Sequence, residues 1–250
     1  MSNSPNTTDH QDTSIRPAAT VLLLRDSDDG LQTLLLRRNK ALKFAGGSWV
    51  FPGGRIDQNE IDQADDLDQA ARNAAVREAQ EESGLVVEAC ELVHFGHWTT
   101  PIGMPKRFAT WFFAAPLNSS DGQDSGRVEV DGGEIHEFQW LTPAEALTQH
   151  RALELTIMIP TFICLRLLQP YATVAEAMVA LRQMTPYQVT PNSLKHEGRF
   201  VSLYPGDAGF EMRDPNLPGE RHRCFETDQG YVYEHSGAGV GVAPMDKAQC

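Results

Sequence analysis

Three glutamates stand close together in the segment REAQEESGL at residues 77–85. Glu78, Glu81 and Glu82 are spaced i, i+3 and i+4, so on a helix they share one face. Like charges at i and i+4 repel each other by about 0.2–0.5 kcal/mol, and the negative end of the helix dipole disfavours acids in the last turns. A divalent cation would remove both penalties, and a set of carboxylate oxygens favours Mg²⁺ or Mn²⁺. A solvated acidic helix end, partly neutralised by Arg77, explains the same spacing, so the spacing alone leaves both interpretations open.

The glutamates need a helix to position them, and the surrounding sequence predicts one. Residues 65–83 are rich in alanine, contain neither Gly nor Pro, and precede Gly84, a residue typical of helix ends. A glycine-rich loop ending in FPGG at 51–54 lies upstream, after a predicted hairpin of buried strands at 18–25 and 31–38. Further strands are predicted near 86–98, 108–115 and 136–141, and capping boxes at Thr142–Glu145 and Thr173–Glu176 each predict the start of a helix.

The loop and the helix together resemble the Nudix box, G-x5-E-x7-R-E-U-x-E-E-x-G-U, where U is a bulky apolar residue. The chain matches its fixed positions with Gly54, Glu60, Arg77, Glu78, Glu81, Glu82, Gly84 and Leu85. It departs from the box at two points. An insertion of nine residues leaves 16 residues between Glu60 and Arg77 where the box has seven, and position 79 is Ala. The insertion leaves the half with the glutamates intact, but the sequence does not fix whether Glu60 still lies beside Arg77.

This resemblance to the Nudix hydrolase family implies a fold and a reaction. The fold would be an α/β/α sandwich with a mixed sheet, in which the box forms loop–helix–loop, followed by C-terminal helices and an aromatic-rich extension. The reaction would be hydrolysis of a phosphoric anhydride in a nucleoside diphosphate derivative, with Mg²⁺ or Mn²⁺ held by Glu78, Glu81 and Glu82. The resemblance also implies catalytic roles for Arg77 and Glu81, and for Glu134 as general base. A surface acid at the start of a strand is the alternative interpretation of Glu134.

Two features bear on the substrate, and they disagree. The insertion, the WVFPGG segment at 49–54 and the stretch 100–108 are similar to the peroxisomal coenzyme A diphosphatases and their bacterial relatives. Residues 34–54 also partly match the signature of coenzyme A-directed enzymes, L-L-T-x-R-[SA]-x3-R-x3-G-x3-F-P-G-G. Arg38 fits this signature, whereas Lys43 replaces its second arginine, and Leu36 and Asn39 also depart from it. Pro101 is instead similar to a proline of Nudix enzymes that act on ADP-ribose, although an ordinary turn proline would explain it too. We expect coenzyme A or acyl-coenzyme A first, and ADP-ribose or another nucleoside diphosphate sugar second.

Basic residues are scarce, so the places where they gather are candidate substrate contacts. Arg38 and Lys43 are the candidates for the 3′-phosphate of coenzyme A, and Lys106 with Arg107 forms a second basic pair. The predicted substrate-binding residues are Arg38, Lys43, Gly53, Gly54, Pro101, Lys106 and Arg107. A non-catalytic ligand sensor with the same fold is the alternative from another class. Such sensors usually have broken box carboxylates or a fused DNA-binding domain, whereas here the carboxylates are intact.

The composition of the chain excludes some classes of binding partner. The chain has 21 Lys and Arg against 34 Asp and Glu, a net charge of -13, which disfavours binding to nucleic acid or anionic membrane through bulk charge. The four cysteines form no C-x-x-C pair, the N-terminal residues lack the apolar core of a signal peptide, and the most apolar run, 157–168, is too short to span a bilayer. We therefore expect a cytoplasmic monomer or homodimer whose partner is a small molecule.

The chain length suits one large domain with an extension. We expect residues 1–15 to be disordered, 16–184 to form the Nudix hydrolase domain, and 185–250 to pack on it. The extension contains seven of the 20 aromatic residues, too many for a solvated tail, and about its last 12 residues are expected to be loose. Its segments 221–226 and 231–235 predict a hairpin.

Overall fold

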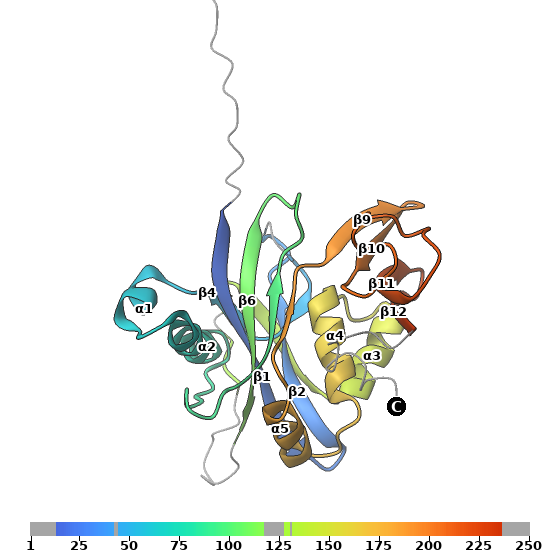
Figure 1. Ribbon diagram of the computed structural model, residues 1–250. Coiled ribbons are helices and arrows are strands. Elements are labelled where there is room, and N and C mark those ends of the chain that lie inside the picture. The colour runs from blue at the N-terminus through green and yellow to red at the C-terminus, as the bar shows by residue number, and fades with distance from the viewer. Residues whose placement is uncertain (1–13, 43–44, 118–127, 131, 237–250) are drawn as a thin grey trace, which may run out of the picture.

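The computed structural model describes residues 14–42, 45–117, 128–130 and 132–236. They form a mixed sheet with helices on both faces and a second, smaller sheet beside it (Figure 1). This arrangement confirms the expected α/β/α architecture. The expected loose C-terminal residues, and all but the last two residues of the expected disordered N-terminus, lie outside the described ranges.

The large sheet is built around β1 (Ile15–Ser27), which pairs antiparallel with β2 (Gly30–Arg38) and parallel with β6 (Arg107–Pro116). Its order is β3-β2-β1-β6-β5-β8, with β4 paired to β1 and β7 paired to β2. The remaining strands are β3 (Trp49–Val50), β4 (Gly53–Arg55), β5 (Val93–Thr99), β7 (Ile135–Leu141) and β8 (Tyr187–Val189).

The first two strands separate at one end, and this separation creates the place for the site. Their register runs from Ser27 opposite Gly30 to Leu24 opposite Thr33. Beyond it, β1 pairs instead with β4, while β2 pairs with β3 and β7. The FPGG segment therefore fills the split between β1 and β2.

The helix α2 (Leu67–Ser83) covers one face of the sheet and confirms the helix predicted over 65–83. Asp66 caps its first turn by accepting from the backbone N–H of Gln69, and Gly84 ends it with φ 73°, a left-handed conformation that glycine adopts without a steric penalty. Its buried side chains are mostly alanines, which let the helix lie close to the strands. The glutamates project from its last two turns.

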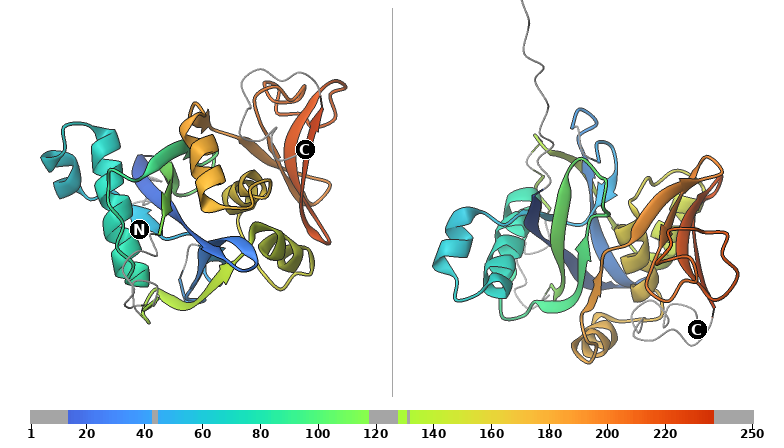
Figure 2. Two further views of the ribbon diagram at one scale, coloured as in Figure 1. Left: turned by 90° about the horizontal axis from the view of Figure 1, so that it is seen from below. Right: turned by 45° about the horizontal axis from the view of Figure 1, so that its top comes forward.

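Three helices cover the opposite face, whereas α1 (Gln58–Gln63) lies beside α2 (Figure 2). They are α3 (Pro143–Arg151), α4 (Ile159–Leu168) and α5 (Val174–Arg182). Both predicted capping boxes are confirmed, because Thr142 and Thr173 each exchange hydrogen bonds with the glutamate three residues later. Within the described residues, no helix has the length and apolar character needed to cross a membrane.

The C-terminal residues form an antiparallel sheet with the order β12-β11-β10-β9. Its strands are β9 (Asn192–His196), β10 (Arg199–Leu203), β11 (Arg221–Thr227) and β12 (Gly230–Ser236). The pairing of β11 with β12 confirms the predicted hairpin. Tyr204, Cys224 and Tyr233 belong to the same buried cluster as the apolar side chains of α4.

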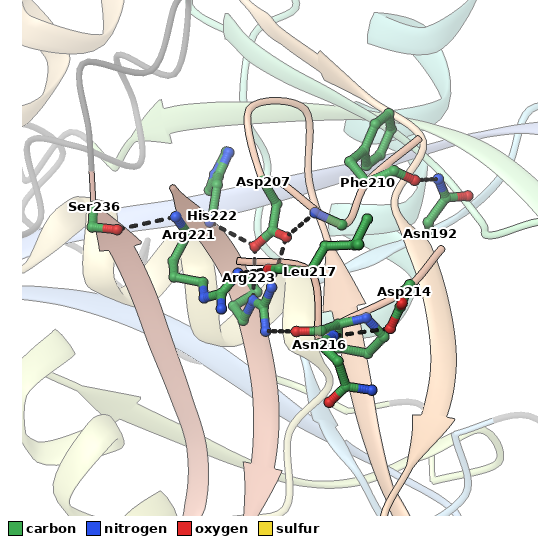
Figure 3. Close-up of polar contacts among 12 residues, drawn as sticks. Asn192, Asp207, Phe210, Asp214, Asn216, Leu217, Arg221, His222, Arg223 and Ser236 are labelled. Atoms are coloured by element: carbon green, nitrogen blue, oxygen red, sulfur yellow. Dashed lines mark hydrogen bonds and ion pairs between the residues drawn. The ribbon is translucent and has the colours of Figure 1, made fainter. Parts of the chain in front are cut away.

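A buried ion pair organises the long connection between β10 and β11 (Figure 3). The carboxylate of Asp207 is fully buried and accepts from Arg223 at 2.7 Å through both Nε and Nη2. It also accepts from the backbone N–H groups of Gly209 and His222, each at 2.9 Å. The remaining guanidinium nitrogen donates to the carbonyl of Pro215.

The predicted strand over 86–98 is only partly correct, because β5 begins at Val93. The residues before it form a turn, and Arg72 of α2 donates to the carbonyl of Leu92 at 2.7 Å. Val87 and Leu92 are buried against α2. Apolar residues of a buried loop therefore gave a strand-like pattern.

Candidate active site

The three glutamates of α2 differ in exposure. The side chain of Glu78 is 14% exposed and that of Glu81 is 59% exposed, whereas Glu82 is buried. The Glu82 carboxylate accepts a hydrogen bond from the backbone N–H of Gly53 at 2.9 Å. This contact joins the C-terminal turns of α2 to the FPGG segment in the sheet split.

Burial raises the pKa of Glu82 to about 8, although the hydrogen bond from Gly53 opposes the shift. The charges of Glu78 and Glu134 raise it further, and that of Arg38 lowers it. Burial likewise raises the pKa of Glu78, with the ion pair to Arg77 acting in the opposite direction. Without a cation, the site therefore resists carrying the full negative charge of its carboxyl groups.

Gly53 and Gly54 lie where no larger residue fits. A Cβ atom at Gly53 would collide with the backbone of Ala19 and Thr20, and one at Gly54 would collide with the carboxylate of Glu78. The two glycines pair with Thr20 and Ala19 of β1. Close approach between strand, loop and helix, rather than an unusual φ, explains why these positions are glycine.

Arg77 joins the box residues into one network. Its guanidinium donates to Glu60 at 3.0 Å, to Glu78 at 2.8 Å, to Glu81 at 2.9 Å and to the carbonyl of Arg55 at 3.0 Å. Burial by itself lowers the pKa of Arg77, but hydrogen bonds to Glu60 and Glu78 raise it above its usual value. The guanidinium remains charged throughout the physiological range.

The insertion does not separate Glu60 from Arg77, a question that the sequence left open. The 16 residues between Glu60 and Arg77 complete α1, form the turn before α2 and supply the first ten residues of α2. Glu60 belongs to a capping box with Asp57, and its Oε2 accepts from the Asp57 N–H at 2.8 Å. Both of its oxygens also accept from Arg77, Oε1 at 3.0 Å and Oε2 at 3.3 Å. This role of Asp57 is absent from the predictions made from the sequence, although the D-x-x-E spacing at 57–60 is the signal for it.

Arg38 and Glu134 meet across β2 and β7. Their side chains form an ion pair at 3.2 Å, and the neighbouring pair Arg37–Glu137 measures 2.8 Å. The β2–β7 register shifts between Arg37 and Arg38, so that Arg37 faces Glu137 and Arg38 faces Ile135. Arg38 also donates its backbone N–H to the carbonyl of Ser48 at 3.0 Å, just before β3 and the FPGG segment that contacts Glu82. The pair therefore lies on the same side of the sheet split as that segment, and its charges contribute to the pKa shift of Glu82.

The other predicted substrate contacts are less closely connected. Lys43 lies outside the described residues. Pro101 and Lys106 lie in the turn between β5 and β6, and Arg107, the first residue of β6, donates to the carbonyl of Thr100 at 3.0 Å. Arg107 pairs with Ile15, four positions before the residue of β1 that pairs with Gly54. The turn thus lies at the same end of the sheet as the glycine loop, with no contact to the glutamates recorded in the described chain.

Among the described residues, no group of three or more His, Cys, Asp or Glu side chains is gathered closely enough to hold a metal ion. A single guanidinium nitrogen of Arg77 instead contacts both Glu78 and Glu81. The donor set still fits a hard divalent cation, because Glu78, Glu81 and Glu82 are carboxylates on adjoining turns.

Comparison with known proteins decides the family. The NUDIX domain matches residues 14–159 of the chain. The chain belongs to the NUDIX family. A crystal structure of a NUDIX hydrolase from Alicyclobacillus acidocaldarius is 25% identical, superposes with a TM-score of 0.58, and covers 67% of this chain and 97% of that one.

Two curated NUDIX relatives differ in the substrate that their names give. The acyl-coenzyme A diphosphatase NUDT19 of Xenopus laevis is 30% identical over 137 residues, covering 52% of this chain and 34% of the relative. The m7GpppN-mRNA hydrolase NUDT17 of Bos taurus is 28% identical over 132 residues, covering 49% of this chain and 40% of the relative. The chain spans about half or less of the length of the curated relatives it matches.

Proposed function

We propose that this NUDIX protein is a metal-dependent hydrolase that cleaves the diphosphate of a nucleoside diphosphate derivative. The observation that carries the proposal is the single network joining the FPGG segment, the three glutamates of α2 and Arg77. Such a network keeps carboxylates together at a helix end where their repulsion is unfavourable. A local arrangement that costs stability is expected at a functional site.

Glu78, Glu81 and Glu82 would hold Mg²⁺ or Mn²⁺. When bound there, the cation would polarise a phosphoryl oxygen and lower the pKa of a coordinated water. Arg77 keeps Glu60, Glu78 and Glu81 oriented within hydrogen-bond distance of one guanidinium. The raised pKa of Glu82 supports the proposal, because a carboxylate that is poorly compensated by solvent gains most from a nearby cation.

Glu134 would accept the proton of the attacking water. Its side chain is 60% exposed, so it can reach a substrate in front of the site, and its charge acts on Glu82. Water adds to one phosphorus, the bridging P–O bond breaks, and the two products leave as phosphomonoesters. Arg38, which faces Glu134, would bind the phosphates.

Coenzyme A or an acyl-coenzyme A is our first candidate substrate. The partial match to the coenzyme A signature through Arg38 supports it, as does the similarity to a relative named as an acyl-coenzyme A diphosphatase. ADP-ribose is the second candidate, favoured by Pro101 at the β5–β6 turn. The coenzyme A diphosphatase subgroup and a cytoplasmic location stay predictions, as does the monomeric or dimeric state.

A substrate panel tests the proposal. Coenzyme A, an acyl-coenzyme A, ADP-ribose, NADH and a dinucleoside polyphosphate are each incubated with the protein and Mg²⁺, and the products are separated by chromatography. We expect 3′-phosphoadenosine 5′-phosphate and a phosphopantetheine from coenzyme A substrates. Faster turnover of ADP-ribose than of every coenzyme A compound would reverse the order of the two candidates. Ligand binding without any turnover would favour the sensor.

A further inference from the structure

Two arginine–glutamate pairs lie side by side across β2 and β7, but their environments differ. Arg37 lies over the ring of Trp49, 5.8 Å from its centroid, and its pair with Glu137 is 30% and 55% exposed. Arg38 is only 18% exposed while Glu134 is 60% exposed. The buried Nε of Arg38 has no hydrogen-bond partner among the residues that the structure describes. Arg38 is thus the more buried arginine, with a donor left unused.

An unused buried donor is costly, and an anion is the partner that best repays this cost. Arg38 lies beside the segment that leads into the glycine loop, because its backbone N–H donates to the carbonyl of Ser48 at 3.0 Å and β2 pairs with β3. Gly53 of that loop donates to Glu82, so a diphosphate in front of the glutamates and the loop lies within reach of the Arg38 side chain. A guanidinium binds one phosphate through two parallel N–H donors. One of these nitrogens, Nη2, is already occupied by Glu134.

Glu134 can give up this contact without unfolding the strand. Its backbone carbonyl accepts from the N–H of Asn39 at 2.7 Å, and the Asn39 side chain donates to the carbonyl of Gly133 at 3.1 Å. These two hydrogen bonds fix the backbone of residues 133 and 134 against Asn39 without using the Glu134 side chain. The exposed carboxylate is therefore the part that rotates most easily, and its ion pair is of the weak, half-exposed kind.

We propose that Arg38 exchanges partners, holding Glu134 in the empty site and the substrate diphosphate in the loaded site. Substrate binding then releases the Glu134 carboxylate, which becomes able to contact the attacking water. The exchange rests on the proposed function, because it assigns Glu134 the role of base. It couples the arrival of the diphosphate to the availability of that base.

A double-mutant cycle on binding tests the exchange. The ligand is α,β-methylene-ADP with Mg²⁺, in which carbon replaces the bridging oxygen, and affinity is measured by calorimetry. Glu134→Gln removes the competitor for Arg38 and should tighten binding about two- to fivefold, the strength of a half-exposed ion pair. In an Arg38→Met background, Glu134→Gln should give no tightening. Glu137→Gln, which removes the same charge from the neighbouring pair, should leave affinity unchanged.

Equal tightening by Glu134→Gln in both backgrounds would overturn the exchange, because it would reveal a general charge effect. The exchange would also be overturned if Glu134→Gln did not tighten binding in the protein that retains Arg38. It would be overturned as well if the unmodified protein did not detectably bind the ligand. Arg38→Lys keeps the charge without the forked donors and serves as a second background if Arg38→Met folds poorly, with a smaller coupling expected. The cycle measures no turnover. A protein that cleaves no diphosphate would thus refute the proposed function alone, and cleavage without coupling would refute the exchange alone.

Discussion

Arg38 has a different place in the molecule from the one that the coenzyme A signature suggests. The signature makes it a candidate for the 3′-phosphate, whereas its ion pair with Glu134 and its backbone bond to Ser48 place it beside the proposed base and the segment that leads into the glycine loop. A guanidinium beside these acids is better placed for the diphosphate, which every candidate substrate contains. The 3′-phosphate would then need other cations, and Lys43, Lys106 and Arg107 remain the candidates.

Arg38→Ala should lower kcat/KM for coenzyme A about 10- to 100-fold, the value of a charge-assisted contact in a partly buried site. The loss should be equal for 3′-dephospho-coenzyme A, because both compounds contain the diphosphate. Steady-state kinetics on the two substrates measures this ratio. A loss confined to coenzyme A would assign Arg38 to the 3′-phosphate instead. Arg37→Ala is the matched control and should change neither value appreciably.

At the scale of elements, two adjacent glycines, Gly53 and Gly54, allow the glycine loop to pack closely against β1 and α2. The atoms that surround each of them differ in how easily they can move. The neighbours of Gly53 are the carbonyl oxygen of Ala19 and the Cα and Cβ atoms of Thr20, which cannot move without the strand β1. The neighbour of Gly54 is the end of the Glu78 side chain, which can rotate. The two glycines should therefore respond differently to the same added methyl group.

Gly53→Ala should lower the free energy of unfolding by about 1–3 kcal/mol, because the sheet must shift to admit the Cβ atom. Gly54→Ala should cost less stability but reduce turnover more, because Glu78 must turn away from its place beside Arg77. Thermal melts and kcat of the two variants provide the comparison. Similar melting temperatures for the two variants would contradict this account of the loop.

The elements that sequence predicts best are those defined by local chemistry. The alanine run ending at Gly84 and the two threonine capping boxes predict helices from neighbouring residues alone, and all three are present. The contact of Glu60 with Arg77 could not be predicted, because it depends on how α1 folds back on α2. Buried apolar loop residues such as Val87 explain why the strand before β5 was drawn too long. The strands β9 and β10, which pair with each other, escaped prediction because they are short and their alternating pattern is weak.

At the scale of the whole molecule, the C-terminal residues contribute to both sheets. β8 pairs with β5 in the large sheet, and the small sheet shares a buried cluster with α4. Truncation after Thr185 should therefore expose apolar surface and lower the melting temperature. Truncation after Thr190 keeps β8 and should lower it less. Unchanged melting curves for both shortened proteins would mean that the extension adds nothing to stability.

The ion pair Asp207–Arg223 should make the stability of the small sheet pH-dependent. Burial raises the pKa of Asp207, but hydrogen bonds from Arg223, His222 and Gly209 outweigh it and hold the pKa below the usual 3.8. Because the folded-state pKa is lowered, the stabilisation is complete above about pH 5 and is lost as pH falls through and below the usual value.

Asp207→Asn should lower the free energy of unfolding by about 3–5 kcal/mol near neutral pH, because it leaves the Arg223 charge buried without a counterion. The difference in melting temperature from the unmodified protein should narrow as pH falls below about 4. Asp228→Asn, which breaks the exposed pair with Arg199 in the same sheet, should have little effect at any pH. A constant difference between pH 3 and pH 7 would contradict the assignment.

The most direct test of the central claim is the Mg²⁺ dependence of diphosphate cleavage by the unmodified protein and by Glu82→Gln. The account predicts product formation that rises with Mg²⁺ and stops in excess EDTA. It predicts turnover at least about 100-fold lower in Glu82→Gln, whose melting temperature should be unchanged or higher because a neutral amide replaces a buried carboxylate and still accepts from Gly53. Glu88→Gln, an equal charge change at an exposed position past α2, should behave like the unmodified protein. Undiminished cleavage in EDTA, or full activity of Glu82→Gln, would contradict the account.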